Sequence, residues 1–216
     1  MARVEIDSPR PTEGAFVRYA GLACCWSGLA GLAAAVALIM VTPAVGEDRF
    51  NYPLHPTAFV AVQVLFFLQH VLLISGQLSL SRSGALGSSK AGQVGIKIAI
   101  VGTAALALSE LWAISAAHAA YPSRQTSIIE SSFGVESLLI GVGFVLAGIA
   151  VWRAGVWGGW RRAVPLALGV YVFVVLVPGL GAGSYVLARL VIGFWMLLFA
   201  LLGWLLWRFA PGPARS

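Results

Sequence analysis

The chain has 216 residues, of which 59% are hydrophobic and only 10% are charged, and its formal net charge is +6. This composition lies outside the range of soluble globular domains and predicts a membrane protein. The excess of basic residues does not indicate nucleic-acid binding, because these residues are spread over loop ends and form neither a basic helix nor a stacking platform.

Almost the whole chain consists of apolar segments and short connections. The apolar segments are long enough to cross a bilayer as helices, which takes about 20 residues each. We therefore predict one all-α domain at residues 18–208, a polytopic bundle of six transmembrane helices joined by short loops. Short tails are expected at residues 1–17 and 209–216. The predicted spans are 19–44, 57–79, 94–118, 134–152, 164–178 and 185–207. The first span is too long for the apolar part of a cleaved signal peptide, so we interpret it as a retained helix.

Small residues recur in two of the predicted spans at a spacing that lets another helix approach closely. They are Ser27, Gly31 and Ala35 in the first span, and Gly141, Gly143, Ala147 and Gly148 in the fourth. The adjacent Cys24 and Cys25 can form neither a normal bridge with each other nor the usual two-residue-spaced metal pair. We interpret both cysteines as packing residues.

The second span carries a polar stripe. Gln63, His70 and Gln77 lie seven residues apart on an otherwise apolar segment. Because two heptads are close to four helical turns, the three side chains share one narrow face of the helix. In lipid such a face must contact other protein or water, which makes this stripe a candidate binding site. The alternative for His70 is a packing role, in which one Gln or Ser partner satisfies a neutral imidazole.

Glu110 lies well inside the third span. A carboxylate at the bilayer centre costs about 2.5 to 3.5 kcal/mol even on the gentlest scale, so Glu110 must be paired, neutral or beside water. Counted by the helical rise from the middle of its span, Glu110 lies roughly 6 Å from the bilayer centre, on the side opposite the two termini. Gln63 lies at about the same height. A hydrogen bond between these two side chains is therefore expected.

Three further residues, His118, Glu136 and Arg189, are predicted to lie with Glu110 in the outer half of the bundle, which is the half away from the two termini. Arg189 should pair with Glu136 rather than with Glu110, because the helical rise places Glu136 at nearly its own depth. Alternatively, Glu136 lies at a solvated helix end, and the long Arg189 side chain extends to the membrane interface.

The connection after the fourth span is rich in tryptophan and arginine. Its members are Trp152, Arg153, Trp157, Trp160, Arg161 and Arg162. Such a patch is typical of the headgroup boundary, and we interpret it as an anchor rather than a specific lipid site. Pro165 suits the first turn of the fifth span, and Pro178 is expected to end it.

The stretch WRAGVWGGWRRAVPLALGVYVFVVLVPGL, at residues 152–180, is followed by ARLVIGFWMLLFALLGWLLW, at residues 188–207. In their placement of aromatic residues and glycines, these segments resemble the C-terminal half of uncharacterised six-span bacterial membrane proteins. The resemblance implies the same topology and a location in the bacterial inner membrane. It implies no activity.

Several kinds of chemistry do not fit the sequence. A haem held by His70 and His118 would need both ligands at one iron, but the helical rise separates them by roughly 20 Å in depth. A zinc site would need three or four convergent ligands, and neither His55 nor His118 has a second His or Cys at ligand spacing. The nucleophile motif GxSxG and the ATP-binding Walker motif are both absent from the sequence. We therefore predict no cofactor and no metal.

Three functions from different classes remain. The one we favour from the sequence is a non-enzymatic accessory protein, which binds a membrane protein partner or a second copy of itself through its small-residue faces. The second is a small transporter or channel that uses the polar stripe and Glu110. An inverted three-plus-three repeat, common in transporters, is not recognisable between the halves. The third is a membrane-embedded enzyme acting on a lipid-like substrate with the outer residues Glu110, His118, Glu136 and Arg189.

The orientation follows from the 14 Lys and Arg residues. With six spans, eleven of them lie on the side that holds both termini, namely Arg3, Arg10, Arg18, Arg82, Lys90, Lys97, Arg153, Arg161, Arg162, Arg208 and Arg215. The opposite side has only Arg49, Arg124 and Arg189. Because cytoplasmic loops carry the excess of basic residues, both termini are predicted to be cytoplasmic.

This orientation can be tested with reporter fusions. A reporter that is active only in the cytoplasm should be active when fused after Ser216, and one that is active only outside should be active when inserted near Arg124. The measurement is reporter activity in intact cells, with each reporter also placed at the other site as the control. The opposite pattern of activities would reverse the predicted topology.

Overall fold

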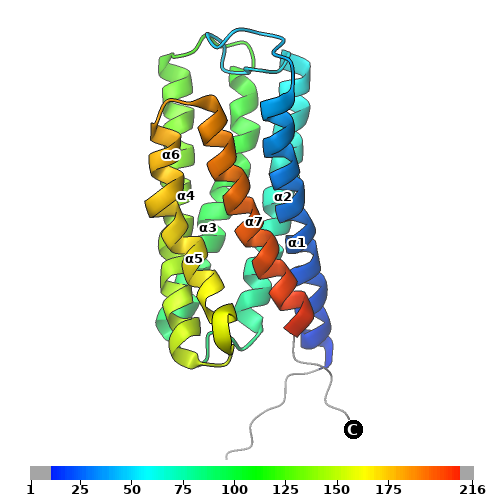
Figure 1. Ribbon diagram of the computed structural model, residues 1–216, viewed down its shortest axis with the longest axis vertical. Helices are drawn as coiled ribbons and strands as arrows, with labels where there is room; N and C mark the ends of the chain where they lie inside the picture. Colours follow the sequence, from blue (N-terminus) through cyan, green and yellow to red (C-terminus); the bar gives the residue numbers. More distant parts are fainter. Residues whose placement is uncertain (1–10, 210–216) are drawn as a thin grey trace, which may run out of the picture.

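The computed structural model describes residues 11–209. Six helical crossings run side by side through the molecule, and each is long and apolar enough to span a membrane (Figure 1). They are α1 (Pro11–Met40), α2 (Pro56–Arg82), α3 (Lys90–Ala113), α4 (Arg124–Ala154), a segmented fifth crossing (Gly159–Gly181) and α7 (Tyr185–Phe209). The prediction of an all-α six-helix bundle is confirmed, and the chain has the architecture of a multi-pass membrane protein.

The six crossings form a closed ring in chain order. Each crossing packs against the next one along the chain, and α7 packs extensively against α1. Helix α1 begins and helix α7 ends at the same end of the bundle, which we call the terminal end (Figure 1). The opposite end, which we call the distal end, carries the loops at residues 41–55 and 117–123. Short connections between neighbouring antiparallel helices explain why chain order and ring order agree.

Several helices extend beyond their predicted apolar spans, and at α4 a capped polar turn accounts for the extension. The Ser123 and Thr126 side chains form a reciprocal capping box, so α4 begins at Arg124 rather than near residue 134. Ile128 and Ile129, which the sequence placed in the preceding loop, therefore lie in α4. Helix α1 begins at Pro11, so residues 11–17 of the predicted tail are helical, whereas residues 1–10 lie outside the described part.

The fifth crossing is divided into four parts. A 3₁₀ turn (η2, Gly159–Ala163) leads into α5 (Val164–Tyr171), a π-helical turn (η3, Val172–Leu176) and α6 (Val177–Gly181). Pro165 lies in the first turn of α5, as predicted. Pro178 does not end the crossing. A proline ring inside a regular helix clashes with the carbonyl four residues earlier, and the wider π turn just before Pro178 provides the space that lets the chain continue to Gly181.

The small residues of α1 and α4 mediate contacts within the bundle. A Cβ atom added to Gly143 of α4 would lie 2.5 Å from the backbone nitrogen of Ala99 in α3. A Cβ atom added to Gly31 of α1 would lie 2.7 Å from the Met196 side chain of α7. Ser27 donates a hydrogen bond to the backbone oxygen of Gln69 in α2 at 2.8 Å. Both predicted small-residue faces are thus covered by helices of the same chain.

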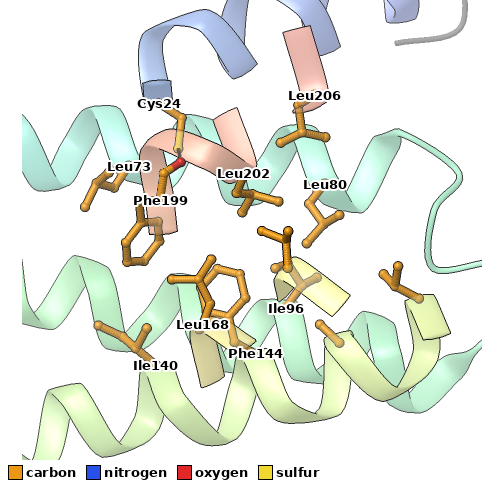
Figure 2. Packing of buried hydrophobic residues seen from close by; sticks show 14 of the residues in the cluster. Cys24, Leu73, Leu80, Ile96, Ile140, Phe144, Leu168, Phe199, Leu202 and Leu206 are labelled. Atoms are coloured by element: carbon orange, nitrogen blue, oxygen red, sulfur yellow. Dashed lines mark hydrogen bonds between the residues drawn. The ribbon is translucent and has the colours of Figure 1, made fainter. Parts of the chain in front are cut away.

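An apolar core runs through the interior of the ring, and Figure 2 shows part of it. Phe144 of α4 and Phe199 of α7 meet edge to face at 5.5 Å between ring centres, and Trp195 contacts Phe199 in the same way at 5.4 Å. Aliphatic side chains lie around these rings, including Leu80 of α2, Ile96 of α3, Leu168 of α5 and Leu202 of α7. Packed apolar side chains fill this part of the interior.

Two glycines of α4 provide a matched test of the packing. Replacing Gly143 by alanine should lower the free energy of unfolding by about 1–3 kcal/mol, because the new methyl group overlaps the α3 backbone. Replacing Gly134 by alanine should be neutral or raise stability by up to about 1 kcal/mol, since no described residue lies within 4 Å of its added Cβ and alanine favours helix. Thermal unfolding in detergent measures both. Equal effects of the two substitutions would contradict the close contact between α3 and α4.

Candidate functional site

The polar residues of α2 face the interior of the ring. Gln63, His70 and Gln77 are 6%, 7% and 0% exposed, whereas Val64 and Val71, one residue further along, are 40% and 44% exposed. A spacing of one residue turns the side chain by about 100° around the helix, which accounts for this contrast. The polar stripe therefore contacts protein rather than lipid.

His70 and Glu110 form the centre of the site. The Nδ1 atom of His70 lies 2.7 Å from the backbone oxygen of Phe66, and because a carbonyl can only accept, Nδ1 carries the hydrogen and donates it. The same Nδ1 atom is 3.9 Å from Oε1 of Glu110, and both side chains are almost fully buried. In the neutral imidazole this arrangement leaves Nε2 as the acceptor.

The Glu110 carboxyl group has three further polar neighbours. The Gln63 side chain lies against it, as the equal heights predicted, and Arg189 and Glu136 are close enough to interact with it electrostatically. These groups come from α2, α7 and α4, while Glu110 belongs to α3. Four different crossings thus contribute ionisable or amide side chains to one region of the interior.

Glu136 lies beside hydroxyl groups rather than beside a cation. Ser109 of α3 donates a hydrogen bond of 2.6 Å to Oε1 of Glu136, and Ser132 approaches the Ser109 hydroxyl at 3.4 Å. The second carboxyl oxygen, Oε2, is buried and has no hydrogen-bond partner among residues 11–209. Glu136 is therefore only partly satisfied by the protein.

The predicted ion pair between Arg189 and Glu136 is wrong, since no such pair forms among the described residues. The Arg189 guanidinium instead lies 5.0 Å from the ring centre of Tyr185, one turn earlier in α7. Helical side chains tilt toward the N-terminus of their helix, and α7 begins at the distal end, so Arg189 leans toward that boundary. Equal depth was not enough to make a pair, because the Arg189 guanidinium lies over the Tyr185 ring while the Glu136 carboxyl group accepts a hydrogen bond from Ser109.

His118 is also not part of the site. Helix α3 ends at Ala113 and is followed by a short 3₁₀ turn (η1, Ile114–Ala116), so His118 lies in the distal loop rather than in a span. Its side chain is exposed, and its backbone oxygen accepts a hydrogen bond from Arg49 at 3.4 Å. His118 therefore does not join Glu136 and Arg189 in the predicted outer cluster.

Gln77 marks the inner limit of the polar region. Its Nε2 atom donates to the Thr103 hydroxyl of α3 at 2.7 Å, and Thr103 donates in turn to the Ala99 oxygen at 2.9 Å. Sequence reasoning missed Thr103, Ser109 and Ser132, because single hydroxyl residues are common in membrane helices. The available signal was the presence of Ser109 next to Glu110, on the same helical turn as a predicted site residue.

We define the inner polar cluster as Gln63, His70, Ser109, Glu110, Ser132 and Glu136. These residues lie around the middle of the bundle and toward its distal end, and buried apolar residues lie on both sides of them, such as Leu80 toward the terminal end and Phe59 and Ile129 toward the distal end. Among residues 11–209, no three His, Cys, Asp or Glu side chains are arranged to hold a metal ion. The cluster combines carboxyl, imidazole, amide and hydroxyl groups, which can accept and donate protons.

No protein family model, curated protein or solved structure matches the chain. The resemblance of residues 152–180 and 188–207 to six-span bacterial membrane proteins therefore remains a prediction. The function has to be argued from the inner polar cluster itself.

The hydrogen bond from Ser109 to Glu136 can be measured by a double-mutant cycle. Ser109→Ala should lower the free energy of unfolding by about 0.6–2 kcal/mol, the usual range for hydrogen bonds between membrane helices. The stability effects of Ser109→Ala and Glu136→Gln should couple in the double variant. Those of Arg189→Leu and Glu136→Gln should be additive. Thermal unfolding in detergent provides the data.

Ser131 provides the control for this cycle. It is exposed on α4 and bonds only to the Ser127 oxygen of its own helix, so Ser131→Ala should leave stability nearly unchanged. A coupling of Arg189 with Glu136 larger than that of Ser109 with Glu136 would restore the ion pair expected from depth.

Proposed function

We propose that this protein is a small proton-transporting protein of the bacterial inner membrane, with both termini in the cytoplasm and the inner polar cluster as its proton-binding site. The observation that carries the proposal is the buried approach of His70 to Glu110, 3.9 Å apart in the interior of an apolar six-helix bundle. Ionisable side chains inside a membrane bundle are costly, and where they occur they commonly mark ion pathways and proton relays. The excess of basic residues at the terminal end supports the orientation.

A proton suits this cluster better than a metal ion or a larger solute. The described residues do not bring three metal-binding side chains together, and two surface cavities at the terminal end lie away from His70 and Glu110. A proton needs no cavity, because it can move along a chain of donors and acceptors. The Ser109 hydroxyl, which lies 2.6 Å from Oε1 of Glu136 and 3.4 Å from the Ser132 hydroxyl, supplies part of such a chain.

Unused bonding capacity also supports proton binding. The Oε2 atom of Glu136 and the Oε1 atom of Gln77 are buried without a partner among the described residues. A cluster that served only to hold the helices together would be expected to satisfy its polar atoms, because each unsatisfied group costs about 1–3 kcal/mol. A carboxyl group that gains and loses a proton needs free acceptor sites.

The accessory-protein hypothesis, which the sequence favoured, loses its main argument. It was based on small-residue faces that could receive a partner, but the faces on α1 and α4 pack against α2, α7, α3 and the fifth crossing. The enzyme hypothesis loses its proposed catalytic group, because His118 lies in a distal loop. We therefore place transport ahead of both.

Proton flux through reconstituted protein tests the proposal. Vesicles that contain a trapped pH-sensitive dye and the wild-type protein should dissipate an imposed pH gradient faster than empty vesicles. Glu110→Gln should reduce this flux by roughly ten-fold or more, since a glutamine cannot take up and release a proton. Two substitutions on α4 form a matched pair. Glu136→Gln should reduce the flux, whereas Glu130→Gln should leave it unchanged because Glu130 is exposed.

Two outcomes would contradict proton transport. One is a wild-type flux no greater than that of empty vesicles when the protein is folded and inserted. The other is an equal flux in the wild type and Glu110→Gln, when thermal unfolding shows that both proteins are folded. A stable membrane partner that co-purifies equally with both forms, in the absence of flux, would instead favour the accessory hypothesis.

A further inference from the structure

Two grooves flank the end of α4 at the terminal end of the bundle. The larger, of about 580 Å³, lies between α4 and the turn that joins α2 to α3, with Ser88 and Ser89 at its edge. The smaller, of about 190 Å³, lies between α4 and the start of α5, beside Trp152 and Leu166. Ile149 and Arg153 line both grooves. The two grooves therefore meet at one turn of α4.

The walls of the grooves are mostly apolar and face outward. Ile149 and Trp152 are exposed on the outside of the bundle, at 36% and 44%. In the larger groove Leu86, Leu146 and Ala150 complete the apolar wall. In a membrane, such outward-facing surfaces lie against acyl chains.

Positive charge lies where the two grooves meet. Arg153 is exposed, and no ion pair of Arg153 with an acidic side chain forms among residues 11–209. Close by, the Arg162 guanidinium stacks over the Trp152 ring at 4.3 Å, and its Nε atom is buried without a partner in the same described range. Two guanidinium groups with unused donors thus lie beside the grooves, and guanidinium groups are well suited to bind a phosphate.

We propose that the two grooves together bind one anionic phospholipid. Its phosphate group contacts Arg153, and its two acyl chains lie in the grooves on either side of Ile149. A diacyl lipid has two acyl chains joined at one headgroup, which matches two mostly apolar grooves that share Arg153. Basic pockets between transmembrane helices at the membrane surface are a known setting for anionic headgroups. This site is separate from the inner polar cluster and does not depend on proton transport.

Native mass spectrometry of the detergent-solubilised protein, titrated with dioleoyl phosphatidylglycerol or dioleoyl phosphatidylcholine, tests the site. The wild type should retain one phosphatidylglycerol molecule in preference to phosphatidylcholine. Arg153→Gln should weaken phosphatidylglycerol binding about five-fold, the effect of one basic residue near anionic lipid. Arg124→Gln is the matched control, because Arg124 is exposed at the opposite end of the same helix. It should leave binding unchanged.

A second variant tests the apolar part without altering charge. Ala91 is exposed and lines the larger groove, so Ala91→Leu should narrow the groove and also weaken retention of the lipid. Equal retention of the two lipids, or equal losses in Arg124→Gln and Arg153→Gln, would overturn the proposal. Displacement of the lipid by glycerol 3-phosphate alone would also overturn it, because the acyl chains would then contribute nothing.

Discussion

The close contact of α1 with α7 is the constraint on which the rest of the structure depends. A Cβ atom added to Gly28 of α1 would lie 2.5 Å from the Ala200 nitrogen of α7, so the two backbones nearly touch. This contact joins the first crossing to the last and closes the ring. Only a closed ring provides an interior where polar side chains such as Gln77 and Glu136 are shielded from lipid, in which an unpaired polar group costs several kcal/mol.

The sequence predicted the class of fold because apolar length and the positions of polar residues are direct consequences of the bilayer. Six apolar runs predicted six crossings, and the heptad spacing of Gln63, His70 and Gln77 predicted one buried face of α2. Helix ends were less accurate, because hydropathy ignores capped polar turns such as the one at Ser123. The π turn before Pro178 was also missed, since it is a response of the backbone that no residue pattern encodes directly.

The site was predicted only in part, because helical rise gives a side chain's depth but not its direction around the bundle. Equal depth correctly placed Gln63 beside Glu110, which belong to neighbouring helices. Equal depth failed for Arg189 and Glu136, where the tilt of the Arg189 side chain toward Tyr185 decides the outcome. The contact of Ser109 with Glu136 depends on how α3 and α4 are rotated against each other, and glycines such as Gly143 set that rotation.

Aromatic packing on α4 and α7 offsets part of the cost of the acids buried in the bundle. Each edge-to-face pair formed by Phe199 with Phe144 and with Trp195 contributes about 0.5–1.5 kcal/mol beyond burial. Such gains are comparable to the cost of one unsatisfied buried oxygen, like that of Glu136. They come from α7 and α4, which also carry Arg189 and Glu136. The two helices that carry these buried polar groups are therefore also joined to each other by the contact of Phe144 with Phe199.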